Sequence, residues 1–82
     1  MNRLTLPLMK PYRNADSGVT GYEYNDRRIH IRFASGAIHA YTRASIGAKH
    51  LAALKKLADS GDGLNTYINK HHRVKNGSTR IG

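Results

Sequence analysis

The 82-residue sequence contains no cysteine and no tryptophan, and it has only one phenylalanine, two prolines and five acidic residues. Without cysteine, the chain has no disulfide bond and no thiolate ligand for a metal. No run of about 18 apolar residues is present, so no segment is predicted to span a membrane. The apolar stretch near the start is interrupted by Pro7 and is shorter than the roughly 7–15 residues of a signal-peptide core. We therefore expect a cytoplasmic protein.

The scarcity of acidic residues leaves the chain strongly basic. Fourteen Lys and Arg residues against five Asp and Glu residues give a net charge of +9. Such an excess favours polyanionic partners, above all nucleic acid. The five histidines have no carboxylates arranged for acid–base catalysis. The adjacent His71 and His72 would diverge by about 100° on a helix, so they could not easily bind one metal ion together. We predict a protein without enzymatic activity, cofactor or metal site.

The middle of the chain contains three runs typical of short β-strands, separated by two turn signals. The runs are residues 19–24, 28–33 and 37–42. In the register that we favour, Ile31 faces His39 and Ile29 faces Tyr41, which places His39 and Tyr41 on the core face of the sheet. A register shifted by one residue would bury the other side chains of the third strand, Ile38 and Ala40.

Helical spacing begins after the third strand. Ser45 is predicted to cap a helix that starts at Ile46 and ends near residues 59–63. Its buried stripe is predicted to contain Leu51, Leu54 and Ala58. A second helix is expected at about residues 64–70, where Leu64, Tyr67 and Ile68 would be buried. The predicted fold class is α+β, a three-stranded antiparallel meander followed by two helices packed on one sheet face.

The two ends of the chain are predicted to lie outside this domain. Residues 1–16 read as a basic N-terminal arm, with two prolines that forbid a regular helix across them. Residues 71–82 are polar, basic and glycine-containing, and they read as a basic flexible tail. The domain itself is assigned to residues 17–70. A chain of this size has a small core, so we expect a monomer or a weak homodimer.

The order of elements and several short motifs resemble the KTSC domain. This module is named from the C-terminus of some lysyl-tRNA synthetases and also occurs as small stand-alone bacterial proteins. The matching pieces are Val19 with Gly21-Tyr22-Glu23, Ile29-x-Ile31-x-Phe33-x-x-Gly36, Ile38-His39-Ala40-Tyr41, and Gly61-x-x-Leu64-Asn65-x-x-Ile68. The sequence departs from the family at His39, where the family prefers tyrosine, at Ser45, where it prefers proline, and at Leu64, where it prefers an aromatic residue.

The resemblance covers roughly residues 17–70. It implies the β-β-β-α-α fold, and it implies no established activity. RNA binding is suggested only by the synthetase context.

The strict alternation of residues 28–33 points to a cationic sheet surface. Side chains two residues apart share a face, so Ile29, Ile31 and Phe33 face the core. The other face carries three basic or titratable side chains about 6–7 Å apart. This distance is close to the spacing of phosphates along an extended nucleic-acid strand. Those three, with further cations on the helix and the tail, form the predicted nucleic-acid-binding set: Arg28, His30, Arg32, Arg43, Lys49, Lys56, Arg73 and Lys75. The alternative is an ordinary solvated face.

The predicted function is a small basic nucleic-acid-binding module that makes mainly phosphate contacts. RNA or single strands are favoured, because the solvent side of the first helix carries Ala and Lys rather than base-reading Asn, Gln and Arg. Sheet tyrosines suggest base stacking, although we expect Tyr22 and Tyr41 to be core residues. The alternative function is a protein-interaction module that docks on an acidic protein, through the same basic face or through the edge strand of residues 19–24.

Overall fold

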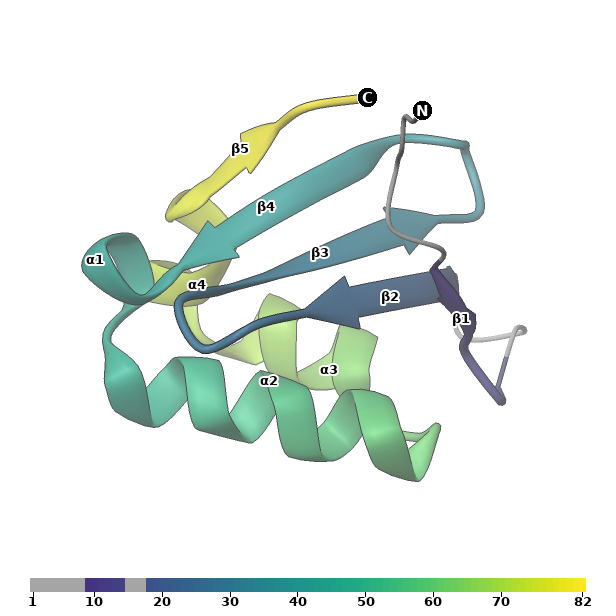
Figure 1. Cartoon of the computed structure of the whole chain (residues 1–82), viewed down its shortest axis with the longest axis horizontal. Coiled ribbons are helices and arrows are strands. Elements are labelled where there is room, and N and C mark those ends of the chain that lie inside the picture. Colours follow the sequence, from purple (N-terminus) through teal and green to yellow (C-terminus); the bar gives the residue numbers. More distant parts are fainter. Residues whose placement is uncertain (1–8, 15–17) are drawn as a thin grey trace, which may run out of the picture.

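The computed structural model describes residues 9–14 and 18–82. Within these ranges the chain forms one five-stranded antiparallel sheet and four helices. The strands follow one another across the sheet in sequence order: β1 (Lys10–Pro11), β2 (Val19–Tyr24), β3 (Arg28–Phe33), β4 (Ile38–Thr42) and β5 (Ser78–Arg80). The helices are α1 (Arg43–Ile46), α2 (Ala48–Ser60), α3 (Leu64–Lys70) and α4 (His72–Asn76). Figure 1 shows α2 and α3 on one side of the sheet and α1 at the end of β4.

The α+β class is confirmed, as is the favoured register of the second hairpin. Ile31 is paired with His39 and Ile29 with Tyr41, so the side chains of β4 at these two positions lie on the helix side. The tight turn is closed by the backbone N–H of Phe33, which donates to the carbonyl of residue 37 at 2.9 Å. The alternation of apolar side chains decided this register, because a shift of one residue would turn the apolar set toward solvent.

The core lies between the helix side of the sheet and the inner faces of the helices. Its fully buried side chains come from three strands and all four helices: Val19, Ile29, Ile31, Tyr41, Ile46, Leu51, Leu54, Ala58, Leu64, Ile68 and Val74, each at most 4% exposed. Leu51, Leu54 and Ala58 form the predicted stripe of α2. Tyr67 of α3 is only half-buried, which differs from the prediction.

The helix that was predicted to start at Ile46, with Ser45 as its cap, is interrupted. Thr42 is the N-cap of α1: its hydroxyl accepts from the backbone N–H of Ser45 at 3.1 Å, and Ser45 completes the reciprocal capping box. Ser45 is therefore the third residue of α1, not its cap. Gly47 then adopts φ +88°, a conformation that glycine takes without penalty, and α2 begins at the next residue.

The segment that was predicted to be a flexible tail forms α4 and β5, which corrects that prediction. Val74 of α4 is fully buried. Gly77 allows α4 to approach α1, since a Cβ at this position would lie 2.7 Å from both the Arg73 carbonyl and Ile46 Cγ2. β5 pairs with β4 through His39 and Arg80. One buried valine in a polar run gives no periodic signal, so the sequence pattern missed both elements.

The predicted N-terminal arm also joins the fold over part of its length. Lys10 and Pro11 pair with Tyr22 and Gly21 of β2. Tyr12 is 3% exposed, and its hydroxyl accepts from the backbone N–H of Leu64 at 3.1 Å. The compact unit thus begins before residue 17, and β2 is not a free edge along its whole length. Residues 1–8 of the arm, including Arg3, lie outside the described residues.

Within the part of the chain that the structure describes, no helix is both long enough and apolar enough to cross a membrane.

Candidate nucleic-acid interface

The sheet face opposite the helices carries Arg28, His30 and Arg32, and it also carries an acidic side chain. Glu23 of β2 is the cross-strand partner of His30. Its Oε1 accepts from Arg28 Nη1 and lies 2.9 Å from His30 Nδ1. The Glu23 side chain is only 13% exposed, so this ion pair is sheltered from water. The face is therefore not a bare cationic track, because one carboxylate neutralises its central part.

His30 adds no positive charge to this face at neutral pH. Burial lowers the pKa of the imidazole below its usual 6.5, the neighbouring Arg28 guanidinium lowers the pKa further, and Glu23 opposes both effects. His30 Nδ1 lies 2.9 Å from Glu23 Oε1 and 3.3 Å from Arg28 Nη1, and a neutral ring that carries its proton on Nδ1 donates it to Glu23. His30 thus contacts Glu23, and its lowered pKa reduces the positive charge that it would offer to a phosphate.

Arg32 lies flat along β2. Its Nε donates to Thr20 Oγ1 at 3.1 Å, and the Thr20 hydroxyl lies 3.3 Å from the carbonyl oxygen of Arg32. The guanidinium covers Gly21, where an added Cβ would come within 3.0 Å of Arg32 Nη2. Gly21 therefore provides the space in which Arg32 packs on the sheet.

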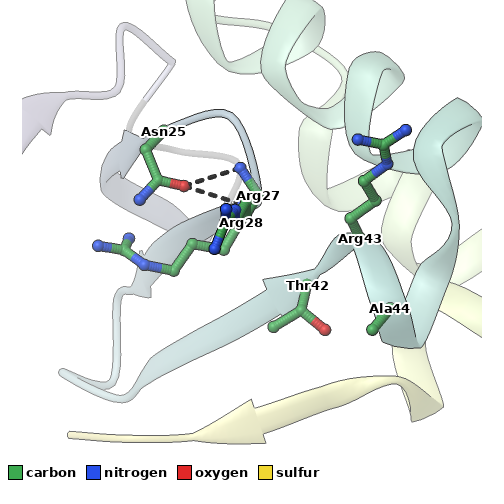
Figure 2. Close-up of a pocket in the computed structure, with 6 residues that line it drawn as sticks. All are labelled: Asn25, Arg27, Arg28, Thr42, Arg43 and Ala44. Carbon is green, nitrogen blue, oxygen red and sulfur yellow. Dashed lines mark hydrogen bonds between the residues drawn. The ribbon is translucent and has the colours of Figure 1, made fainter.

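A pocket at one end of the sheet collects three arginines. It has a volume of about 530 Å³ and lies between the β2–β3 turn and the junction of β4 with α1. We call it the arginine pocket; its lining residues are Asn25, Arg27, Arg28, Thr42, Arg43 and Ala44. Figure 2 shows these side chains, with Arg27 and Arg28 on one wall and Arg43 on the other.

Backbone hydrogen bonds fix the two walls of the arginine pocket. Asn25 Oδ1 accepts from the backbone N–H groups of Arg27, at 2.9 Å, and Arg28, at 3.1 Å (Figure 2). The backbone N–H of Arg43 donates to the Arg27 carbonyl at 2.8 Å, which ties the turn to the start of α1. The side chains of Arg27 and Arg43 therefore extend from a braced backbone into solvent, while Arg28 is partly buried.

The arginine pocket combines one paired and two unpaired guanidinium groups. Arg28 is engaged with Glu23. The side chains of Arg27 and Arg43 are exposed, and among the residues that the structure describes neither takes part in an ion pair. Each retains its planar set of donors, which suits bidentate contact with a phosphate or carboxylate.

The structure brings together only part of the predicted set. Arg28 and Arg43 share the arginine pocket, whereas Lys49 and Lys56 are exposed on α2, which packs its other side on the sheet. Arg73 approaches the α1–α2 connection: a Cβ on Gly47 would lie 3.7 Å from its guanidinium. The last member of the set, Lys75, lines a different pocket.

Arg27 was missed by the sequence analysis. It lies in the turn and not in the alternating run of β3, so the face argument could not include it. The available signal was Asn25, because an Asn at the start of a turn often accepts hydrogen bonds from the backbone N–H groups two and three residues later and so fixes the turn. Glu23 was missed as a partner because its register against β3 depends on a β-bulge between Val19 and Gly21.

The tyrosines do not form a free stacking surface. Tyr22 and Tyr41 are buried, as expected, and burial raises the pKa of Tyr41 to about 12. Tyr24 is 37% exposed, but its hydroxyl donates to Asp59 Oδ2 at 2.6 Å and the Lys55 ammonium lies 5.3 Å from its ring centre. These contacts hold Tyr24 against α2 and Tyr22.

In the residues that the structure describes, no group of three or more His, Cys, Asp or Glu side chains is arranged to hold a metal ion.

Comparison with known proteins gave no match: no protein-family model matches the chain, and no similar curated protein or solved structure was found.

Proposed function

We propose that this protein binds nucleic acid, RNA or a single strand in preference to a duplex, mainly through phosphate contacts centred on the arginine pocket. The observation that carries the proposal is that two exposed arginines without an ion pair to any described residue, Arg27 and Arg43, line one concave surface together with Arg28. A phosphate diester offers two terminal oxygens to such a fork of donors. The net charge of +9 draws a polyanion toward the surface, and the pocket gives it a specific place to bind.

The preference for single strands follows from the shape of the basic surface. The exposed side of α2 carries Lys49, Ala52 and Lys56, which lack the amide and guanidinium groups that read base edges in a major groove. The arginine pocket lies at the end of the sheet, at a turn and a helix junction, and not along an element that enters a groove. The resemblance to the KTSC domain supports RNA only through its synthetase context.

The number of contacts is predicted to be small. Glu23 already satisfies Arg28 and His30, so the pocket provides two free guanidinium groups and one shared one. About three phosphate contacts would give a slope near −2 for log affinity against log salt on a single strand. A slope near zero would exclude phosphate binding as the main source of affinity.

The proposal is tested by fluorescence anisotropy with single-stranded RNA, single-stranded DNA, duplex DNA and heparin across a salt series. The variant R27S/R43S removes the two free guanidinium groups, and the matched control K49S/K56S removes the same charge from α2. At physiological salt we expect the arginine variant to lose about tenfold or more in affinity, because each charged hydrogen bond that it loses contributes about 1 kcal/mol or more. Equal losses in both variants would refute a specific site.

The same experiment separates the alternative function, docking on an acidic protein. A protein-docking module should bind every polyanion weakly and independently of length, heparin included. Docking of a partner along the edge of β2 is less favoured, because β1 already pairs with Gly21 and Tyr22 of that strand. Selective binding of one nucleic acid over heparin would favour the proposed function.

A further inference from the structure

A second pocket lies on the helix side of the sheet, away from the arginine pocket. Its volume is about 320 Å³, and it opens between β3 and β4 on one side and α3, α4 and the start of β5 on the other. We call it the aromatic–amide pocket; it is lined by Phe33, His39, Tyr41, Asn65, Ile68, Asn69, Lys75 and Ser78. Of these residues, only Lys75 belongs to the set predicted for phosphate binding.

The inner part of this pocket is apolar and aromatic. Tyr41 and Ile68 are buried and therefore form its floor. Phe33 is partly buried and meets the ring of His39 edge to face, with ring centres 5.5 Å apart and planes at 89°. An apolar floor with aromatic walls favours a flat, weakly hydrated ring system, since stacking on an aromatic side chain is worth about 1–3 kcal/mol per base.

The rim of the pocket supplies hydrogen-bonding groups of both kinds. His39 Nδ1 lies 3.0 Å from Ser78 Oγ, and Ser78 Oγ donates to the Lys75 carbonyl at 3.4 Å. Nδ1 of His39 is therefore engaged with Ser78, and Nε2 is the ring nitrogen that a ligand can contact, as a donor or an acceptor according to the tautomer. Asn69 Nδ2 donates to Asn65 Oδ1 at 3.3 Å, and this hydrogen bond uses one of the two amide hydrogens of Asn69. The other amide hydrogen and the carbonyl oxygen of Asn69 form a donor–acceptor pair at an exposed position.

We propose that the aromatic–amide pocket binds a nucleobase, with the paired rings of Phe33 and His39 as one aromatic wall, Asn69 contacting the base edge and Lys75 contacting the attached phosphate. An Asn side chain is suited to bidentate contact with a base. The volume of about 320 Å³ is near the lower limit of the roughly 300–1,000 Å³ of ligand pockets, which fits one nucleotide and not a dinucleotide. If the base belongs to a bound strand, the inference rests on the proposed function. A free nucleotide would present the same base and phosphate to the pocket.

The two pockets can be tested independently. His39 and Thr42 are three residues apart on β4, about 10 Å along the strand, and they lie on opposite faces. A phosphate in the arginine pocket and a base in the aromatic–amide pocket therefore belong to different nucleotides. Binding at one pocket does not require binding at the other.

The test is a titration of the full chain followed by amide NMR, with the four ribonucleoside 5′-monophosphates, ribose 5-phosphate and inorganic phosphate as probes at millimolar concentration. We expect nucleotides to shift the signals of His39, Asn69 and Lys75, and ribose 5-phosphate to leave those of His39 and Asn69 unchanged. N69A should weaken nucleotide binding by about tenfold. The control N76A removes an exposed amide from the adjacent helix and should have no effect.

The outcomes distinguish this inference from the proposed function. The base pocket would be overturned if nucleotides caused no shifts, or if ribose 5-phosphate caused shifts as large as those of the nucleotides. In either case, salt-dependent strand binding that is lost in R27S/R43S would still support the proposed function. Nucleotide shifts that N69A removes would establish the base pocket even if R27S/R43S bound strands normally. A ten-nucleotide RNA that shifts both pockets identifies a strand as the source, and shifts from the monophosphates alone identify a free nucleotide.

Discussion

At the scale of single residues, Glu23 decides how much of the cationic sheet face is available to a polyanion. It accepts from Arg28 and from His30 in a sheltered position. The alternation of β3 was sufficient to predict which side chains share the face, but not which group across the strands would pair with them. That pairing depends on the register of β2, which a bulge resets.

The variant E23Q is expected to strengthen polyanion binding. It removes one negative charge and frees the Arg28 guanidinium, which lines the arginine pocket. The gain should be about threefold, consistent with the 0.2–1 kcal/mol of a partly exposed ion pair. D26N, which removes the same charge from the exposed β2–β3 turn, is the control for net charge alone. Fluorescence anisotropy with a single-stranded RNA at fixed salt measures the affinity of both variants. Equal gains in affinity would mean that Arg28 does not contact the RNA.

His30 predicts a pH dependence of stability whose sign can be worked out. Burial and Arg28 lower its pKa in the folded state, so the unfolded chain binds a proton at higher pH than the folded chain does. The stability that the neutral ring contributes is fully present above its unfolded pKa of 6.5, and it is lost as the pH falls toward the lower folded pKa. H30Q should therefore lose less of its Tm than the parent protein between about pH 7 and pH 5. An identical loss in thermal melts of both proteins would contradict this account.

At the scale of elements, periodicity succeeded where a segment has a repeating buried face. β2, β3, α3 and the buried stripe of α2 were predicted at or near their observed positions. It failed for α4 and β5, where Val74 is the single buried apolar residue, and for α1, where Gly47 breaks the helix through a positive φ. Short elements with one anchor are positioned by tertiary packing, which a sequence pattern does not contain.

The variant V74A tests whether the C-terminal segment is part of the folded unit. Val74 is fully buried beside α1, so truncation should cost about 2 kcal/mol through lost burial and a residual cavity. For a domain of this size, that corresponds to a Tm lower by roughly 10 °C. I81A is the matched control, because Ile81 is 53% exposed and its truncation should leave Tm nearly unchanged. Equal, small effects in thermal denaturation would restore the flexible tail that the sequence suggested.

At the scale of the whole molecule, the two ends of the chain complete the sheet. β1 and β5 are two and three residues long, and they cover the outer edges of β2 and β4. Short outermost strands limit edge-to-edge association. The sequence predicted the α+β class from residues 17–70, and it left open which sheet face the helices cover. It did not predict the arginine pocket, because Arg27 and Arg43 meet only through the contact between a turn and a helix start.

The net charge of +9 and the arginine pocket act over different ranges, and salt separates them. At about 0.01 M salt the screening length is about 30 Å, close to the 40 Å longest dimension of the protein, so every cation attracts a bound strand. At about 0.15 M it falls to about 8 Å, and only charges near the bound phosphates contribute. R27S/R43S and K49S/K56S carry the same net charge. Their affinities for single-stranded RNA should therefore converge at low salt and separate by about tenfold at physiological salt. Curves that stay parallel at all salt concentrations would mean that charge number alone determines binding.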